Sequence, residues 1–291
     1  MDLNNEQILC RLCGSGATAD FHTTLLNRYE VTYYKCQECE LIQSETPFWL
    51  QEAYEKAISI LDTGIFQRNN DNVKKLTVLL TEIQSQLFQS KNRLKGFLKS
   101  RLPFQGKILD YGGGHGVLVR LLRDVGFDCY WYDKYATNDF AGGFEFGANE
   151  NYDIVLAFEL FEHFENPKES VNEILALAKP KILIFSTLLY GNTTPPKDWW
   201  YYAFEAGQHI AFYNTKTLQK IASLHGYYTF SLVEDLHFLV RNDVKLNFMR
   251  LKRRLQRLDM EFLKAKSLYR SKTIEDHNLL KKKIVETFHQ D

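Results

Sequence analysis

Apolar residues recur every three or four positions in the stretch before Pro103, and this spacing places them on one face of an α-helix. The residues that follow this rule are Leu76, Leu79, Leu80, Ile83, Leu87, Leu94 and Leu98. Because proline removes a backbone donor and clashes with the preceding turn, a helix should not run through Pro103. The pattern therefore predicts that residues 46–103 form a helical connector.

After Pro103 the pattern changes to short apolar runs that alternate with helix-like stretches. The predicted strands are 107–110, 127–132, 144–146, 153–158 and 181–186. The predicted helices are 117–125, 167–179 and 215–225, followed by an antiparallel edge pair at 227–232 and 236–240. Strands and helices in alternation form a parallel sheet with helices on both faces, joined by right-handed crossovers. We therefore expect an α/β domain over residues 104–240.

The pattern becomes helical again in the C-terminal part of the chain, which we expect to be a basic helical tail over residues 241–291. Its apolar seam, at spacings of four, three and four residues, consists of Leu251, Leu255, Leu258 and Phe262. The other positions are rich in Lys and Arg, with runs at 252–254 and 281–283. Such a run is typical of a solvated helix face, and peripheral contact with an anionic membrane is the alternative.

Composition limits the classes of protein that this chain can belong to. Its 291 residues are enough for about two domains, and the 45% hydrophobic and 14% aromatic fractions supply a packed core. Formal net charge is zero, so the whole molecule has no field that would attract a polyanion. No apolar run approaches the ~20 residues that span a bilayer. We therefore expect a soluble, cytoplasmic protein whose thiols stay reduced.

Four of the five cysteines form two C-x-x-C pairs near the N-terminus. These cysteines are Cys10, Cys13, Cys36 and Cys39. Two residues between the members of a pair allow one turn to direct both thiolates at the same ion. Two such pairs, about twenty residues apart, supply the four sulfur ligands that structural Zn²⁺ prefers.

Two disulfides, or four unrelated core cysteines, are the alternatives to a metal site. Disulfides are disfavoured because residues 1–7 are polar and contain no apolar segment of a secretory signal. A thioredoxin-like redox site uses one C-x-x-C pair rather than two. We therefore predict a structural zinc-binding lobe at residues 1–45. A site closed by four protein ligands performs no chemistry, so the activity is expected elsewhere.

A glycine-rich loop, Asp110-Tyr111-Gly112-Gly113-Gly114-His115-Gly116, connects the predicted strand 107–110 to the predicted helix 117–125. Glycines at such a turn let the backbone approach a ligand, and the following helix offers unpaired N–H groups. A dinucleotide fingerprint that begins at Gly112 would need its third glycine where Val117 stands, and no P-loop sequence occurs.

The spacing of Asp110, Gly112, Gly114 and Gly116 resembles the first motif of class I S-adenosylmethionine-dependent methyltransferases. The resemblance implies a Rossmann-like sheet in which the glycines make room for the methionine part of S-adenosylmethionine and Asp110 accepts from its ammonium group. Asp133, about twenty residues further on, is placed to accept hydrogen bonds from both ribose hydroxyls. A helix N-cap or turn residue is the alternative role for Asp133.

The stretch 151–167 is similar to a second segment of the same family, which carries two glutamates followed by a histidine and a proline. Residues at the carboxyl end of a parallel strand face the ligand crevice, so we expect Phe158 and Glu159 to line the cofactor site. Glu162 and His163 are candidate catalytic residues. Pairing or capping at the start of a helix is the alternative for both.

Two further segments resemble one branch of the family, the zinc-binding methyltransferases of sugar and polysaccharide biosynthesis. They are the cysteine lobe at 10–44 and the segment 205–213. The resemblance implies that His209 is the catalytic base, while a structural histidine is the alternative. Gln208 stands where the carbon-methylating members carry glutamate, and a neutral amide cannot raise the basicity of the imidazole. We therefore favour transfer to a sugar hydroxyl over transfer to a sugar carbon.

An aromatic cluster at 199–204 precedes His209 and is suited either to stacking on a sugar or nucleotide ring or to packing within a lid. The predicted partner is a small-molecule sugar acceptor on a nucleotide- or lipid-linked glycan.

Two other functions compete with this one. The first is an RNA methyltransferase, which the N-terminal lobe disfavours because residues 10–40 contain three basic and four acidic residues. The second is a cofactor-binding module without catalysis, which the intact glycine loop does not distinguish from an enzyme. The sequence does not indicate an oligomeric state.

Overall fold

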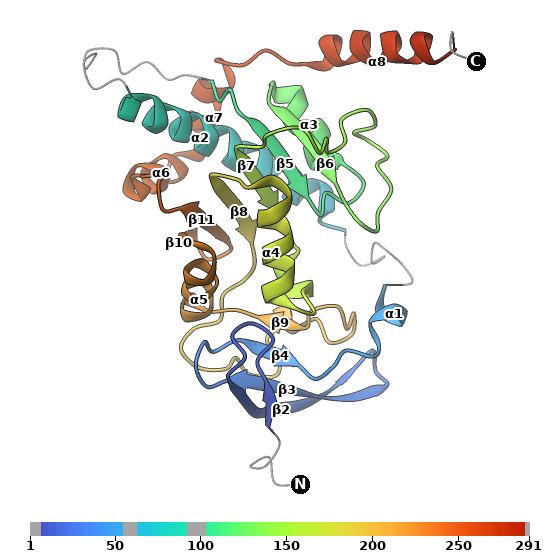
Figure 1. Ribbon diagram of the computed structural model, residues 1–291, viewed down its shortest axis with the longest axis vertical. Coiled ribbons are helices and arrows are strands. Elements are labelled where there is room, and N and C mark those ends of the chain that lie inside the picture. The colour runs from blue at the N-terminus through green and yellow to red at the C-terminus, as the bar shows by residue number, and fades with distance from the viewer. Residues whose placement is uncertain (1–6, 55–62, 92–102, 289–291) are drawn as a thin grey trace. The chain divides into compact units, whose positions relative to one another are not determined.

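The computed structural model describes residues 7–54, 63–91 and 103–288 (Figure 1). Two positions of the predicted helical pattern, Leu94 and Leu98, lie outside these residues. The chain folds into two compact units: the first consists of Met1–Asp62 and Leu156–Asp243, and the second of Thr63–Val155 and Val244–Asp291. Each unit joins segments that are distant in the sequence. The four domains predicted from the sequence are instead consecutive segments of the chain, and the boundaries of these domains stay predictions.

The first unit contains an antiparallel sheet built around the cysteine pairs. Its strands, in spatial order, are β1 (Gln7–Leu9), β2 (Gly16–Leu25), β3 (Tyr29–Cys36), β4 (Ile42–Ser44) and β9 (Ala211–Phe212). Strand β9 comes from a distant part of the sequence and pairs Phe212 with Ile42 of β4. The predicted N-terminal lobe is therefore completed by a strand that the sequence analysis did not assign to it.

Aromatic side chains fill the core beside this sheet. Tyr33 of β3 stacks on Phe21 of β2 with ring centroids 4.9 Å apart, and its ring lies 5.9 Å from that of Phe212. Trp49 is also buried, and its indole Nε1–H donates to the carbonyl of Gly207 at 2.8 Å. Large rings contribute much buried area in a small domain, and the hydrogen bond satisfies the polar atom of Trp49. The aromatic core therefore joins the N-terminal strands to the segment before β9.

The larger sheet has the strand order β10-β11-β8-β7-β5-β6. Its strands are β5 (Lys107–Tyr111), β6 (Asp128–Tyr132), β7 (Ile154–Ala157), β8 (Ile182–Ser186), β10 (Tyr227–Val233) and β11 (Leu236–Arg241). Strands β5 and β6 are parallel, and β11 pairs antiparallel with both β8 and β10. The α/β fold class and the antiparallel pair after residue 226 are confirmed.

The predicted strand at 144–146 is wrong. Only one residue of it, Glu145, forms a bridge, opposite Trp131 of β6. Turns on both sides limit the pairing to this bridge. Before it the N–H of Phe144 donates to the carbonyl of Ala141 at 3.0 Å, and after it the N–H of Glu150 donates to the carbonyl of Gly147 at 3.0 Å.

The helices outside the tail follow the predicted positions closely. They are α1 (Leu50–Ala53), α2 (Ile65–Lys91), α3 (Val117–Val125), α4 (Pro167–Ala178) and α5 (Thr215–His225), with 3₁₀ turns at Phe161–His163 and Trp200–Tyr202. Helix α3 begins after Gly116 and ends at Gly126, both at positive φ. Helix α5 is capped by Asn214, whose side chain accepts from the N–H of Thr217 at 3.0 Å. These end residues explain why the boundaries could be located in the sequence.

Helix α2 carries the apolar stripe that the sequence analysis identified before Pro103. Four of its predicted positions are buried: Leu76, Leu79, Leu80 and Ile83. Within the second unit α2 packs against α3, α6 (Phe248–Leu255) and α7 (Leu258–Lys266). The helical pattern of residues 65–91 is thus confirmed, and its stripe forms part of the core of that unit.

The tail is helical, as predicted, but its seam is broken into separate helices. Helix α6 ends at Leu255, α7 begins at Leu258, and α8 covers Thr273–Phe288. Arg254, next to the break, binds Glu82 of α2 at 3.2 Å and Glu261 of α7 at 2.8 Å. This ion-pair network turns part of the basic run inward. None of the helices that the structure describes is long and apolar enough to cross a bilayer.

A buried ion pair connects α8 to α3 in the second unit. Both Asp276 and Arg123 are at most 3% exposed, and the two nitrogens Nε and Nη2 of Arg123 donate to the Asp276 carboxylate at 2.8 Å. Arg123 also lies 3.7 Å above the ring of Phe144. Such a bidentate pair is sensitive to the loss of one partner, because the other charge then stays buried without compensation.

We expect Asp276→Ala to lower the free energy of unfolding by about 3–5 kcal/mol, because it removes the bidentate partner of buried Arg123 and leaves that guanidinium only the 3.2 Å pair with half-buried Asp128. Urea denaturation measures this change. Glu275→Ala is the matched control: its side chain is 74% exposed, and we expect a change of less than about 0.5 kcal/mol. Equal stability of the two variants would contradict the proposed role of Asp276.

Candidate functional site

The four cysteine sulfurs of the N-terminal pairs lie close together in the first unit. The Sγ atoms of Cys10 and Cys39 are 3.6 Å apart, those of Cys13 and Cys36 are 3.5 Å apart, and all four lie within 4.8 Å of one another. A tetrahedral zinc ion with bonds of about 2.3 Å holds its sulfurs about 3.8 Å apart. The four residues therefore fit structural Zn²⁺.

The two cysteine turns have the same backbone geometry. Gly14 follows the first pair and Glu40 follows the second, and both adopt left-handed φ values, 77° and 61°. In each turn the N–H of that residue donates to the carbonyl of the first cysteine, Cys10 at 2.9 Å and Cys36 at 3.2 Å. The matched turns present both sulfurs of a pair on one side, as a shared ion requires.

The thiols of this set influence each other. A hydrogen bond between Cys10 and Cys39 lowers the pKa of Cys10 and raises that of Cys39, while burial raises the pKa of Cys36. A cation among the four sulfurs would favour the thiolate form, which is the form that binds metal. The fifth cysteine, Cys129, is buried in β6, where burial raises the pKa of its thiol.

The second cysteine turn is attached to the start of α5. The Glu40 carboxylate accepts from Asn214 Nδ2 at 2.6 Å and from Lys216 Nζ at 3.1 Å. Thr217 Oγ1 donates to the carbonyl of Cys39 at 2.8 Å. The sequence analysis missed these residues, although the order Asn214-Thr215-Lys216-Thr217 at a helix start is a capping signal that could have identified the first of them.

The glycine loop lies between β5 and α3 in the second unit. Gly112, Gly114 and Gly116 have positive φ values of 74°, 51° and 84°, which L side chains rarely adopt. A Cβ on Gly116 would meet the Asn138 side chain and Ala141, whereas a Cβ on Gly114 would meet no atom within 4 Å. Gly116 is thus required by packing, and Gly114 borders open space in which a ligand has room.

Asp110, at the end of β5, is a buried acid. Burial raises the pKa of its carboxyl to about 8, and the neighbouring Asp133 carboxylate contributes to the rise. A cation placed beside Asp110 would relieve both effects, since it favours the charged carboxylate. The ammonium group of S-adenosylmethionine is such a cation, so Asp110 and the open space at Gly114 fit the cofactor implied by the loop.

Asp133 already holds a turn. Its Oδ2 accepts from the N–H of Gly114 at 2.9 Å, and its Oδ1 accepts from the N–H groups of Tyr135 and Ala136 at 2.8 and 2.9 Å. Asp133 therefore acts as a turn residue, which was the alternative role for it, and its binding of the ribose stays a prediction. Trp131, which the sequence analysis did not identify, supports the same loop by donating from Nε1 to the carbonyl of Gly114 at 2.7 Å.

Glu159 follows β7 in a strained backbone conformation. Its φ of 50° is left-handed, which costs roughly 1–3 kcal/mol for a residue with a side chain. Ser186, the last residue of β8, accepts from the Glu159 N–H at 2.7 Å and donates to its Oε1 at 2.7 Å. The serine therefore fixes both the backbone and the carboxylate. Phe158, just before it, is half-buried, and the cofactor contacts expected of both residues stay predictions.

Glu162, His163 and His209 come together in the first unit. One possible ligand atom of each lies within 4.8 Å of the others, a spacing that would also allow them to share a metal ion. The two imidazole rings are 4.9 Å apart and nearly perpendicular. The N–H of Ile210, next to His209, donates to the carbonyl of Glu162 at 2.9 Å. The three candidates, chosen from separate segments, thus form one cluster, while their catalytic roles stay predictions.

Backbone carbonyls determine which nitrogen of each histidine is available. Nδ1 of His209 lies 2.6 Å from the carbonyl oxygen of Tyr201, and Nδ1 of His163 lies 3.1 Å from that of Gln208. A carbonyl only accepts, so each Nδ1 carries the proton and each neutral ring has its lone pair on Nε2. The Tyr54 hydroxyl also lies 3.0 Å from Nδ1 of His163.

Burial keeps both imidazoles neutral. It lowers the pKa of His163 to about 3, with a further decrease from nearby His209, and it lowers the pKa of His209 as well. A neutral imidazole whose Nε2 lone pair is available can accept a proton or bind a metal ion. Both rings therefore offer an Nε2 lone pair at neutral pH, while the lowered pKa makes each a weaker base than a free imidazole.

The residues around His209 are held mainly by hydrogen bonds to the backbone. The side-chain amide of Gln208 donates to the carbonyl of Ala53 at 2.6 Å, and the Tyr33 hydroxyl donates to the carbonyl of His209 at 3.0 Å. Tyr201 and Tyr202 of the aromatic cluster are buried in the core, whereas Trp200 is 74% exposed. Packing thus accounts for both tyrosines, and only Trp200 has the exposure that stacking on a ligand requires.

Comparison with known proteins identifies the class. A family model described as a methyltransferase domain matches residues 79–232, which is more than half of the chain. The chain therefore belongs to this methyltransferase family, and its α/β fold is the Rossmann-like fold of S-adenosylmethionine-dependent methyltransferases. No curated protein matches the sequence.

Solved structures with a similar fold are distant in sequence. One is an O-methyltransferase family protein from Burkholderia thailandensis, with 14% identity, a TM-score of 0.39, and coverage of 70% of this chain and 65% of that chain. Another is magnesium protoporphyrin IX methyltransferase from Synechocystis PCC 6803 with bound SAH, with 16% identity, a TM-score of 0.34, and coverage of 66% and 93%. The chain thus spans less than two thirds of the length of the first of these structures.

We expect the purified protein to contain one zinc ion per chain and the double variant Cys36→Ser/Cys39→Ser to contain none, because two ligands are lost. Elemental analysis by mass spectrometry measures the zinc content. Cys129→Ala is the control, since this thiol lies in β6 outside the cluster, and it should retain zinc. Zinc content that is equal in all three proteins would refute the assignment. The double variant should also lose near-ultraviolet circular dichroism, because the second turn supports α5.

Proposed function

We propose that this protein transfers the methyl group of S-adenosylmethionine to a sugar hydroxyl of a nucleotide- or lipid-linked glycan. The observation that carries the proposal is the state of His209. Its Nδ1–H donates to the Tyr201 carbonyl, so the Nε2 lone pair is available to accept the proton of an acceptor hydroxyl. The match of residues 79–232 to a methyltransferase domain supports the transfer of a methyl group.

In this proposal the glycine loop holds the cofactor, which supplies an electrophilic methyl group on sulfur when bound. Asp110 accepts from its ammonium group, and Gly112 and Gly114 keep the backbone clear of its methionine part, while Gly116 serves packing. Asp133 accepts from the ribose, using acceptor capacity beyond the turn that it already holds. Phe158 and Glu159 are proposed as further cofactor contacts because they follow a strand of the sheet. The contribution of these residues is alignment, which accounts for much of the rate in a displacement reaction.

The acceptor side is assigned to the cluster of Glu162, His163 and His209. His209 accepts the hydroxyl proton at Nε2, and the Glu162 carboxylate, within 4.8 Å of the nearest histidine nitrogens, stabilises the imidazolium that forms. The Gln208 amide donates to the Ala53 carbonyl and supplies no charge to His209. We therefore favour a hydroxyl, whose proton is easier to remove than that of a sugar carbon. Identification of the methylated atom in the product distinguishes the two.

The RNA methyltransferase alternative has less support. Arg11, one of the few basic residues of the N-terminal sheet, donates through Nη2 to the backbone carbonyl of Ser44 at 2.9 Å, and burial lowers the pKa of its guanidinium. A phosphate-binding surface needs several exposed cations, which this sheet does not concentrate. A module without catalysis would not need two half-buried neutral histidines that each keep an Nε2 lone pair.

We expect His209→Ala to reduce transfer of label from methyl-tritiated S-adenosylmethionine into sugar-nucleotide or lipid-linked glycan fractions of a cell extract by about 100-fold or more, because the general base is lost. His277→Ala, at an exposed position of α8, is the control and should keep full transfer. Binding of S-adenosylhomocysteine, measured by calorimetry, should be equal in both variants. Label that enters RNA, or transfer that survives in His209→Ala, would overturn the proposal.

The pH dependence of kcat/KM gives an independent test. Burial lowers the pKa of His209 below its ordinary value of about 6.5, so more than half of the base is neutral at pH 6.5. The midpoint of the acid limb should therefore lie below 6.5. An acid limb with its midpoint at or above 6.5 would show that His209 is not the group that titrates.

A further inference from the structure

The charge of this protein is distributed unevenly. Formal net charge is zero over the whole chain, yet residues 245–272 contain ten Lys and Arg residues against two acidic residues. This range includes α6 and α7. The rest of the chain is correspondingly acidic, so the C-terminal part carries a local positive field that the net charge conceals.

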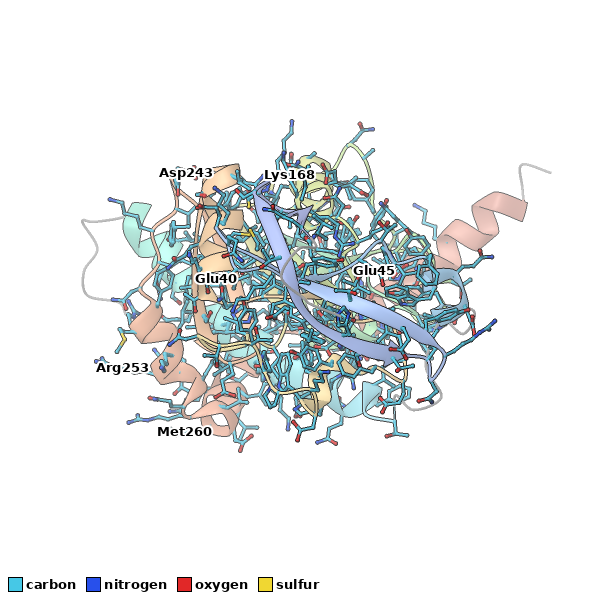
Figure 2. All side chains as sticks on the ribbon, turned by 90° about the horizontal axis from the view of Figure 1, so that it is seen from below. Glu40, Glu45, Lys168, Asp243, Arg253 and Met260 are labelled. Carbon is cyan, nitrogen blue, oxygen red and sulfur yellow. The ribbon has the colours of Figure 1, made fainter. Side chains whose placement is uncertain are left out.

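The structure separates the basic residues that are used internally from those that face solvent. Arg250 binds Glu82 at 2.9 Å, and Arg254 binds both Glu82 and Glu261. Lys252 and Arg253, between them in sequence, are exposed. Figure 2 shows Arg253 pointing outward from α6. The run 252–254 is thus divided, with one arginine holding the helices together and two cations on the surface.

The same outer face exposes aliphatic side chains. Met249 of α6 is 60% exposed, and Met260 and Leu263 of α7 are 45% and 69% exposed. Met260, like Arg253, points outward (Figure 2). In α6 the exposed residues Lys252 and Arg253 come three and four positions after Met249. In α7 the exposed residues Leu263 and Lys264 come three and four positions after Met260. Residues three and four apart share one helix face, so each helix presents a methionine beside a cation.

We propose that this face of α6 and α7 docks on an anionic lipid surface. Cations attract the headgroups, and the methionine and leucine side chains enter the boundary between headgroups and acyl chains. The exposed basic side chains in and next to these two helices are Lys245, Lys252, Arg253, Arg257, Lys264, Lys266 and Arg270. Against them stands one exposed acid of the same range, Asp259. The charge is therefore complementary to phosphatidylglycerol or similar lipids.

The chemistry of the face favours lipid over nucleic acid. RNA is bound by cations together with aromatic rings on which bases stack. The large apolar side chains that α6 and α7 expose are Met249, Met260 and Leu263, none of which is aromatic. These aliphatic side chains can contact lipid, but nucleic-acid bases stack on aromatic rings and not on aliphatic chains. The exposed apolar residues therefore favour lipid over RNA.

Docking would bring the enzyme to a lipid-linked acceptor, and this consequence alone rests on the proposed function. The binding itself is independent of catalysis. The proposed methylation of a glycan does not require membrane binding, and membrane binding does not require methylation. The two proposals are therefore tested separately when vesicle binding is measured without an acceptor substrate.

The test is flotation of the full-length, zinc-loaded protein with phosphatidylcholine vesicles, with and without about one third phosphatidylglycerol, at about 0.1 M salt. We expect the protein to float only with the anionic vesicles. Each Lys or Arg near such a surface is worth about 1 kcal/mol, so Lys252→Gln/Arg253→Gln should lower the partition coefficient about 30-fold. Met260→Ser/Leu263→Ser should also weaken binding, without changing its dependence on salt.

The matched control is Lys168→Gln/Lys197→Gln, which removes two exposed lysines of the first unit and should bind like the wild type. Circular dichroism of each variant verifies that it is folded. The proposal is overturned if the wild type does not float with anionic vesicles, or if the control variant loses as much binding as Lys252→Gln/Arg253→Gln. It is equally overturned if the protein binds single-stranded RNA through Lys252 and Arg253 and not the vesicles.

Discussion

The attachment of the N-terminal cysteine turns to the segment that carries His209 is the constraint on which the candidate site depends. Strand β4 follows the second turn and pairs with β9, so that Gln43 lies opposite Ala211, two residues after the histidine. The N–H of Ser44 donates to the carbonyl of Ile210 at 3.0 Å. A four-cysteine zinc site contributes folding free energy but no chemistry. Zinc bound there would contribute folding energy that helps to position the histidine, so the candidate metal site and the candidate acceptor cluster belong to one structural assembly within the first unit.

The second unit shows how buried charge serves two different purposes. In its helical part charges are compensated: Arg123 pairs with Asp276, and Glu82 binds two arginines. Asp110 at the glycine loop is also buried, but it has no compensating cation among the causes of its pKa shift. Burial and the negative charge of Asp133 both raise the pKa of the Asp110 carboxyl. A compensated pair stabilises packing, whereas a carboxyl whose pKa is raised by burial and a like charge is typical of a site that receives a cation. The contrast distinguishes the structural acids from the candidate binding acid.

Much of the fold and part of the site could be predicted from local sequence. The ends of α3 were visible because Gly116 and Gly126 adopt backbone conformations that glycine favours, and the C-x-x-C spacing indicated the metal ligands. The strand expected at 144–146 is reduced to one bridge, because the sequence pattern could not show that the chain turns on both sides of it. The role of Asp133 was also decided by contacts, since the sequence could not show that both oxygens already accept from backbone N–H groups.

The sequence by itself determined most of the helices and strands, the four cysteines and the glycine loop, because each depends on residue types within a few positions of one another. Only the tertiary structure decided that Glu162, His163 and His209 share one cluster, since these residues come from segments that are brought together by long-range pairing. It also decided the tautomer of each histidine, which depends on a carbonyl from a different residue. In the same way, it divided the basic run of the tail: Arg254 turns inward because Glu82, far away in sequence, lies beside it, while Arg253 faces solvent.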